Sequence, residues 1–322
     1  MASFSLDELL GKDSAAAYTR VERSVATENG LAVTCWLYRA ASVPADAELP
    51  VVVGLHGGPA FAHNYILPLI LLCDAGFAVL LYDQAGCGRS SADVDLAVHP
   101  ELVTLEYYGR ELACVLEAYR LPERGYHLYG SSWGTILAQE HAILQPPGLR
   151  SLVLDGALCD AQLYITSQWR HNLSKLPLLT QARLRALEEA RDFASPSYKC
   201  IEAALTAQYT SRLLPPAQCF LDSVAGVNHA IYVAIQGPSE FAITGSLLET
   251  WSCTERNAAI TVPALVMCGE FDTMTVECSE AVVRSIPRAR PLCTVARAAH
   301  CKLCDEPAQC AELIAAFLAS LD

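Results

Sequence analysis

Residues 126–135 read Tyr126-His127-Leu128-Tyr129-Gly130-Ser131-Ser132-Trp133-Gly134-Thr135, and they carry the strongest structural signal in this 322-residue chain. Apolar residues lead into a serine flanked by glycines, and a run with helical composition follows. Glycines relieve crowding in a tight turn from strand to helix, so the hydroxyl of Ser132 is expected to stand clear of a sheet. The free N–H groups at the helix start favour an anion there. The pattern predicts a nucleophilic serine.

Two later strand patterns supply partners for this serine. A buried-strand pattern over residues 262–268 ends shortly before Asp272, and a second over residues 291–295 precedes His300. An alcohol is a weak nucleophile at neutral pH, so a histidine must take its proton and a carboxylate must hold the imidazole in the right tautomer. The order Ser132, Asp272, His300 is that of α/β-hydrolases. We predict these three residues as a catalytic triad.

The developing oxyanion also needs hydrogen-bond donors. The run His56-Gly57-Gly58-Pro59-Ala60 follows a strand pattern at residues 50–55, and its glycines let backbone N–H groups approach a ligand closely. We assign the oxyanion hole to the N–H groups of Gly58 and Trp133. His56 is expected to brace this loop rather than to act as a base.

Two other acidic residues follow strand-like runs. Asp83 lies in a glycine-rich turn, where a carboxylate bonds local amides and shapes the loop. Asp155 follows the apolar run 151–154 and is an alternative acid for the triad, although it matches no better than Asp272.

Strand and helix patterns alternate along most of the chain. An antiparallel hairpin is expected around Glu28-Asn29-Gly30, and the other strands form a mostly parallel eight-stranded sheet with helices on both faces, which is an α/β fold. The expected strands cover residues 21–27, 31–38, 50–55, 77–82, 126–129, 149–154, 262–268 and 291–295. Expected helices lie between residues 55 and 77, at 102–119 and at 307–318.

The strand rhythm stops between residues 156 and 251, where helical stretches at 182–193 and 197–209 alternate with proline-containing turns. We predict a core domain of residues 1–155 and 252–322, with a helical cap of residues 156–251 inserted after the sixth strand. Such an insertion would form a lid over Ser132. Aromatic residues of the cap could either line a pocket or pack its helices, namely Trp169, Tyr232, Phe241 and Trp251.

Four motifs together resemble the proline iminopeptidase family of α/β-hydrolases. They are His56-Gly57-Gly58-Pro59, Tyr82-Asp83-Gln84-Ala85-Gly86-Cys87-Gly88-Arg89-Ser90, Gly130-Ser131-Ser132-Trp133-Gly134-Thr135 and Gly237-Pro238-Ser239-Glu240-Phe241. The resemblance runs from about residue 20 to the C-terminus. It implies a serine peptidase or amidase that removes an N-terminal residue, often proline, from short peptides or amino-acid amides, under a helical cap and without a cofactor.

The chain departs from the family pattern at two positions. The family loop usually ends in glycine where this chain has Ala60, a mild change if the backbone keeps an ordinary φ angle there. Many relatives carry a glutamate after the catalytic aspartate that helps to hold the α-amine of the substrate, but this chain has Thr273. Of the amine-binding carboxylates that the resemblance implies, only Glu240 is present in this chain. Because a buried ammonium needs charged partners, we expect dipeptides with a free amine to be weak substrates.

Composition excludes other classes of function. A formal net charge of −13 argues against nucleic acid as a partner, which would need a concentrated basic surface. No signal-peptide pattern and no apolar run of membrane-spanning length is found, so we expect a cytoplasmic protein without a membrane partner. A small molecule or a short peptide is the expected substrate, and oligomeric state is left open.

The chain has 14 cysteines, most of them in apolar runs where cysteine acts as a small hydrophobe. The run Cys301-Lys302-Leu303-Cys304 is the one cluster that invites a test as a metal or redox site. A zinc site would need further ligands and would compete for His300, so we expect no metal.

Three functions are considered for a chain with these motifs. The first is amide hydrolysis through an acyl-enzyme on Ser132. The second keeps the triad but acts on an ester, a lactone or another specialised small metabolite, with specificity set by the cap. The third is a ligand receptor or idle scaffold, which the intact triad argues against. Epoxide or haloalkane chemistry would need an aspartate in place of Ser132.

Overall fold

The computed structural model describes residues 3–90 and 94–321. Its strands form one eight-stranded sheet in the order β1-β2-β4-β3-β5-β6-β7-β8. The pairs β1–β2 and β2–β4 are antiparallel, and the remaining pairs are parallel. The strands are β1 (Tyr18–Ala26), β2 (Ala32–Ala40), β3 (Val51–Leu55), β4 (Ala78–Tyr82), β5 (Tyr126–Ser131), β6 (Leu149–Asp155), β7 (Ala264–Gly269) and β8 (Cys293–Val295). The predicted mostly parallel sheet is confirmed.

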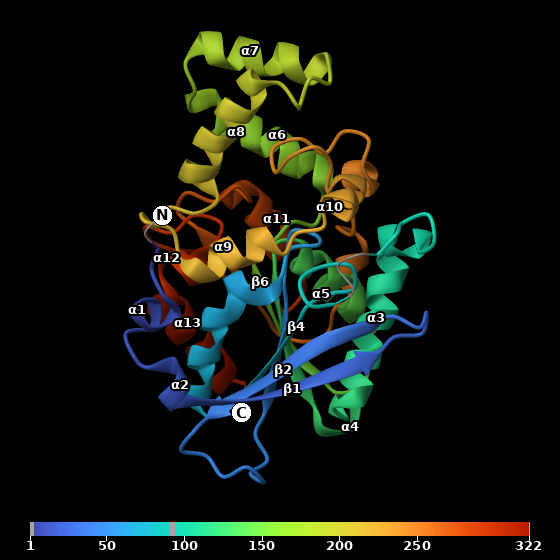
Figure 1. Ribbon diagram of the computed structural model, residues 1–322, viewed down its shortest axis with the longest axis vertical. Coiled ribbons are helices and arrows are strands. Elements are labelled where there is room, and N and C mark those ends of the chain that lie inside the picture. The colour runs from blue at the N-terminus through green and yellow to red at the C-terminus, as the bar shows by residue number, and fades with distance from the viewer. Residues whose placement is uncertain (1–2, 91–93, 322) are drawn as a thin grey trace.

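The central strands are buried on both faces. Every residue of β3, β4 and β5 is buried, because alternate side chains point into two separate apolar cores. In β3, Val51 and Val53 join the core under α3 (Leu105–Ala118), α5 (Trp133–Ile143) and α11 (Val276–Ser285). Val52 joins the core under η1 (His63–Ala75) and α13 (Pro307–Ala319). Helices therefore cover both faces, as Figure 1 shows for α3 and α13.

The helix expected between β3 and β4 is present as the 3-10 helix η1, which contains Pro68. Helix α3 begins at Leu105 rather than at residue 102, because the Thr104 side chain accepts a hydrogen bond from the Tyr107 N–H and caps the helix.

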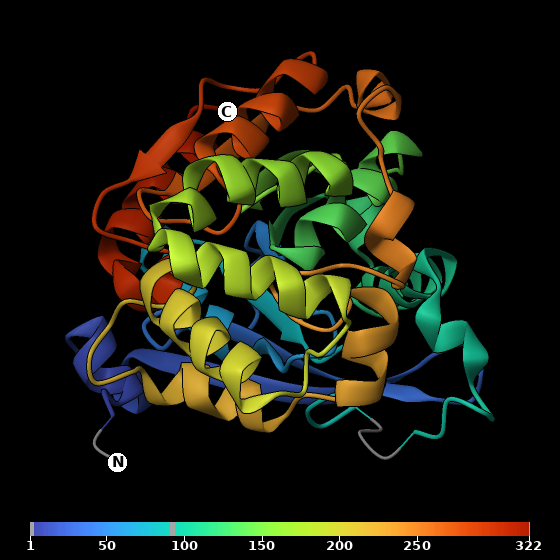
Figure 2. The same ribbon diagram turned by 90° about the horizontal axis from the view of Figure 1, so that it is seen from above.

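A long insertion separates β6 from β7. It contains α6 (Ala161–His171), α7 (Leu178–Glu189), α8 (Pro196–Tyr209), α9 (Gln218–Ala225) and α10 (His229–Ile235), with the 3-10 turns η3 (Leu173–Lys175) and η4 (Leu247–Thr250). Seen from above, α6, α7 and α8 lie over the rest of the molecule (Figure 2). These helices have a small apolar core of their own, formed by Leu173, Leu184, Leu187, Tyr198, Leu205, Tyr209 and Phe241.

The remaining elements are short. They are α1 (Leu6–Leu10), α2 (Ser14–Ala17), η2 (Pro100–Val103), α4 (Leu121–Arg124), η5 (Arg256–Ala259) and α12 (Lys302–Asp305). Within residues 3–90 and 94–321, no helix is both long enough and apolar enough to cross a membrane.

Candidate active site

Ser132 occupies the sharp turn between β5 and α5. Its φ and ψ angles are 56° and −121°, a conformation that few non-glycine residues adopt. The flanking glycines permit the turn, since a Cβ on Gly130 would lie 2.4 Å from the Gly134 carbonyl oxygen and one on Gly134 would lie 2.1 Å from the Leu55 carbonyl oxygen. The Ser132 N–H donates a 2.9 Å hydrogen bond to the Asp155 carbonyl oxygen, which ties the turn to the end of β6.

The imidazole of His300 and the carboxylate of Asp272 contact each other directly. The His300 Nδ1 atom lies 2.6 Å from Asp272 Oδ1, and both side chains are buried. Asp272 sits in the turn after β7 and His300 in the loop after β8, so two neighbouring strand ends bring them together. The rival acid Asp155 has no hydrogen bond to His300 and instead accepts one from the Tyr129 hydroxyl.

Ser132 and His300 line the same small cavity. The Nε2 atom of His300 is buried and has no hydrogen-bond partner among the described residues. The cavity has a volume of about 30 Å³, which by its size holds roughly two water molecules. Its other lining residues are Gly58, Phe61, Tyr65, Thr210, Phe220, Glu240 and Cys301. A substrate can therefore enter only if some of these side chains move apart.

The charges around the imidazole favour its protonated form. Burial acts to raise the pKa of Asp272, but the neighbouring Lys302 and His300 outweigh it and hold that pKa well below its usual range. Burial likewise acts to lower the pKa of His300, but the Asp272 carboxylate outweighs it and the pKa is raised above its ordinary value. Asp272 is thus an anion at neutral pH and stabilises an imidazolium beside it.

The loop after β3 reaches the same cavity through Gly58. Neither the Gly58 N–H nor the Trp133 N–H donates a hydrogen bond to another described residue. His56 braces this loop as expected: its Nε2 accepts the Gln84 N–H at 3.0 Å and its Nδ1 donates to the Gly57 carbonyl oxygen at 2.9 Å. Burial lowers the pKa of His56 to about 4, so this ring stays neutral and acts as a support.

Ala60 does not have the ordinary backbone conformation that would make its replacement of glycine mild. Its φ angle is 59°, in the left-handed region where a Cβ costs about 1–2 kcal/mol. The loop thus keeps a glycine-type conformation with an alanine in it. The Ala60 carbonyl oxygen accepts a 3.0 Å hydrogen bond from the Asn228 N–H, a contact between this loop and the start of α10 that helps to hold the conformation.

The two candidate substrate-binding residues lie in different surroundings. Glu240 lines the cavity, and its Oε1 atom accepts a 3.0 Å hydrogen bond from the Tyr164 hydroxyl. Burial is the main cause that raises the pKa of this carboxyl. Thr273 is fully buried, is absent from the cavity lining, and its Oγ1 atom has no hydrogen-bond partner among the described residues.

The aromatic residues of the cap pack rather than line the cavity. Phe241 belongs to the apolar core of the insertion, Trp169 stacks under the Arg185 guanidinium at 3.8 Å, and the Trp251 indole N–H donates to Glu140 at 2.9 Å. Tyr232 stacks on Phe61, which itself lines the cavity. The aromatic walls are thus Phe61, Tyr65 and Phe220, which sequence patterns did not single out.

Asp83 and Lys302 complete the surroundings of the site. Asp83 accepts hydrogen bonds from the backbone N–H groups of His63 and Arg89, both at 2.8 Å, and so shapes its loop as expected. Lys302 was missed by the sequence analysis as a site residue, although its 2.6 Å hydrogen bond to Asp272 is among the shortest contacts there. One indication of this role was present in the sequence, namely a single lysine within the apolar run that follows His300.

The cysteines form no metal centre in the part of the chain that the structure describes. All fourteen are free thiols, and the Cys219 and Cys304 sulfur atoms are 3.9 Å apart.

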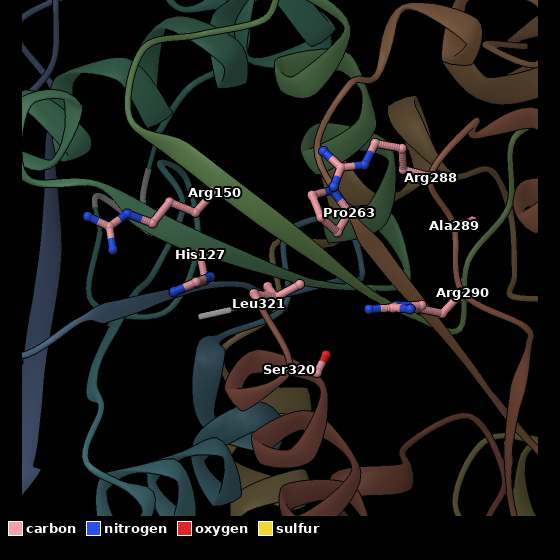
Figure 3. A pocket seen from close by; sticks show the side chains of 8 residues that line it. All are labelled: His127, Arg150, Pro263, Arg288, Ala289, Arg290, Ser320 and Leu321. Carbon is pink, nitrogen blue, oxygen red and sulfur yellow. The ribbon is translucent and has the colours of Figure 1, made fainter.

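A separate cavity of about 660 Å³ lies at the other end of the sheet (Figure 3). It is lined by His127, Arg150, Pro263, Arg288, Ala289, Arg290, Ser320 and Leu321. His127 is near the first residue of β5, whereas Ser132 follows the last, so this cavity is not part of the site around Ser132.

The strand order of the sheet and the chain order of serine, carboxylate and imidazole are those of the α/β-hydrolases. The chain is a serine hydrolase of that class.

Comparison with known proteins narrows the class. Residues 47–307 match the family described as serine aminopeptidase, S33. A proline iminopeptidase of Heyndrickxia coagulans is 33% identical over 273 residues, which are 84% of this chain and 91% of that protein. The structure of a Mycobacterium smegmatis proline iminopeptidase aligns with a TM-score of 0.82 at 29% identity, covering 94% of this chain and 98% of the other. The structure of a protein named VinJ aligns with a TM-score of 0.84 at 26% identity, covering 94% of this chain and 99% of the other. The chain belongs to the proline iminopeptidase family.

Proposed function

We propose that this chain removes the N-terminal residue from a short peptide or an amino-acid amide, through an acyl-enzyme on Ser132. The observation that carries the proposal is the cavity that Ser132 and His300 line together, with a His300 Nε2 that has no hydrogen-bond partner among the described residues. A hydrogen-bonded carboxylate stands behind that imidazole at 2.6 Å. Ser132 is the nucleophile, His300 the general base and acid, and Asp272 the residue that orients His300.

The reaction proceeds in two halves. Ser132 Oγ attacks the carbonyl carbon while its proton passes to His300 Nε2, and the N–H groups of Gly58 and Trp133 stabilise the oxyanion. Collapse breaks the C–N bond, and His300 returns the proton to the leaving amine. Water then attacks the acyl-enzyme, gives its proton to His300, and the N-terminal residue leaves as a carboxylic acid while Ser132 recovers its proton.

Glu240 is proposed to receive the α-amine of the substrate. It is the one carboxylate that lines the cavity with Ser132 among the described residues. Burial raises the pKa of the Glu240 carboxyl, and a substrate ammonium beside it would lower that pKa again. A free amine would therefore meet a single buried carboxylate, with no second one among the described residues that line the cavity to share the charge.

A second candidate substrate follows from Thr273. Because Thr273 is fully buried and offers no charge to a substrate ammonium, the second candidate is an amide or ester whose amine is absent, modified or differently placed. Small esters, lactones and N-acylated amides belong to this group. The triad serves both candidates equally, so substrate preference separates them.

The test pairs a chemical probe with a substrate panel. A fluorophosphonate should label the wild-type protein and should not label Ser132→Ala. The panel compares prolyl, alanyl and leucyl amides with their N-acetyl forms and with the matching methyl esters. The proposal expects kcat/KM for a free-amine amide to exceed that for its N-acetyl form, and comparable values would favour the second candidate.

Glu240→Gln provides the matched variant. If Glu240 receives the amine, this change should raise KM for the free-amine amide by about tenfold while KM for the N-acetyl amide stays within about twofold, since a charged partner contributes roughly 1.5–3 kcal/mol. Glu249→Gln, in the short turn η4 of the same insertion, is the control. Equal changes in KM for both substrates would remove Glu240 from amine binding, and an unlabelled wild-type Ser132 would end the proposal.

A further inference from the structure

Lys302 is a fully buried lysine with three oxygen atoms around its ammonium group. Its Nζ atom donates to Asp272 Oδ2 at 2.6 Å and to the His300 carbonyl oxygen at 3.0 Å. It also forms an ion pair with Asp155 Oδ1 at 3.0 Å. Taking an ammonium out of water costs several kcal/mol even after relaxation, so a buried lysine persists only where its partners compensate for that cost.

The three partners belong to three different elements of the site. Asp272 lies in the turn after β7, His300 in the loop after β8, and Asp155 at the end of β6. The Asp155 backbone carbonyl oxygen accepts the Ser132 N–H at 2.9 Å. One ammonium thus connects the carboxylate, the imidazole loop and the strand end that holds the serine turn.

Lys302 also determines how the Asp272 carboxylate is oriented. Oδ1 receives His300 Nδ1 at 2.6 Å and the Met274 N–H at 2.9 Å. Oδ2 receives Lys302 Nζ at 2.6 Å and the Gly269 N–H at 3.0 Å. Each oxygen therefore has two donors, and the carboxylate cannot rotate without losing a charge-assisted hydrogen bond.

The charges nearly balance within this buried cluster. Lys302 is a cation and Asp272 an anion, whereas burial raises the pKa of the third member, the Asp155 carboxyl, despite the nearby ammonium. Glu240 is the further carboxyl that faces His300, and the Cys301 thiol lies in the same cavity. Lys302 opposes the effect of Asp272 on the imidazole and acts to lower the pKa of His300.

We propose that Lys302 is a positioning residue of the triad, whose ammonium holds the Asp272 carboxylate and the His300 loop against the strand end that carries Ser132. The inference rests on the proposed function of Ser132, His300 and Asp272. Lys302 touches no reacting atom and acts through Asp272.

The test uses one double variant and two single variants that remove the ammonium. In Lys302→Met/Asp155→Asn both charges are replaced by neutral groups, and the Asp155 carbonyl oxygen that holds Ser132 is kept. The single variants Lys302→Met and Lys302→Gln accompany it. Lys199→Met is the control, because Lys199 forms an exposed ion pair with Glu202 at 2.7 Å on α8.

Two readouts are measured on folded protein, namely the rate of fluorophosphonate labelling and kcat/KM for an amide, each from pH 5 to pH 10. In Lys302→Met and Lys302→Gln, which remove the ammonium alone, the acid-side midpoint should move upward, because Lys302 no longer acts to lower the pKa of His300. The plateau at high pH should fall by about tenfold, because the carboxylate is less well held. Lys199→Met should show neither change.

A lysine that serves stability alone would give another result. A folded double variant with the wild-type plateau, or a folded single variant with an unmoved midpoint, would overturn the proposal. Failure of all three variants to fold would assign Lys302 to folding and would overturn it as well. A wild-type protein that is not labelled at Ser132 would instead refute the proposed function, so the two failures are distinguishable.

Discussion

Asn172, which follows helix α6 of the insertion, donates a 3.0 Å hydrogen bond from its side-chain amide to the backbone carbonyl oxygen of Asp272. The insertion thus contacts the turn that carries the triad acid. Two further bonds join the end of α8 to the imidazole loop, from the His300 N–H to the Tyr209 carbonyl oxygen and from the Cys301 N–H to the Thr210 carbonyl oxygen. The insertion is therefore hydrogen-bonded to both loops that carry the acid and the imidazole.

Asn172→Ala should lower both stability and turnover. The Asp272 carbonyl oxygen would remain buried without this donor, so the free energy of unfolding should fall by about 1–2 kcal/mol. Small displacements of the carboxylate should reduce kcat by roughly tenfold. Urea unfolding and steady-state kinetics measure the two effects. Ser174→Ala removes an exposed hydroxyl from the same segment and should change neither, and an Asn172→Ala protein with wild-type kcat would contradict the cap's role.

Asp272→Asn should reduce kcat by about 10⁴-fold at pH 7 while the fold is kept. An asparagine side chain at this position lacks the charge that stabilises the imidazolium and can hold the wrong tautomer of His300. Glu270→Gln, two residues earlier and exposed, is the control with a similar loss of one carboxylate. Similar activity of the two variants would return Asp155 to consideration as the triad acid.

The rate at which a fluorophosphonate labels Ser132 should fall as the pH decreases, with a midpoint above pH 6.5. Burial acts to lower the pKa of His300, but the Asp272 carboxylate outweighs it and raises that pKa above its ordinary value of 6.5. Below that pKa the imidazole carries a proton and cannot accept another from Ser132. A fluorophosphonate has no titrating amine, so its labelling rate from pH 5 to pH 9 reports the enzyme alone. A midpoint clearly below 6.5 would show that burial outweighs the carboxylate.

Glu111 should make the protein less stable as the pH rises. Burial raises the pKa of this carboxyl from 4.5 to about 8. Between these values the folded state holds a proton that the unfolded state has lost, so the free energy of unfolding decreases with pH. Glu111→Gln keeps an acceptor for the Ala85 N–H and removes the titration. From pH 5 to pH 9 the wild type should lose a few kcal/mol more than this variant.

The control for this effect is Glu117→Gln, an exposed position on the same helix α3. Its unfolding midpoint in urea should follow the wild type at both pH values. Parallel loss of stability in wild type and Glu111→Gln would mean that Glu111 is ionised in the folded state.

Local signals were sufficient for the sheet and for the order of the site residues. The glycines around Ser132, the hairpin at Glu28-Asn29-Gly30 and the apolar strand runs each act over a few residues, so they can be recognised in the sequence. Where the chain adopts a conformation against local preference, the expectation failed. The φ angle of 59° at Ala60 depends on the contacts that this loop makes with the start of α10.

The amino-acid sequence by itself determined the α/β fold, the helical insertion and the presence of a serine, a carboxylate and an imidazole in a hydrolase order. Tertiary structure alone decided which carboxylate contacts His300 and which residues surround the cavity. It also decided that Lys302, unremarkable in the sequence, lies fully buried between Asp155 and Asp272. The physical reason is range: backbone propensity and apolar periodicity act between near neighbours in the chain, whereas an ion pair depends on distances that only the packed strands set.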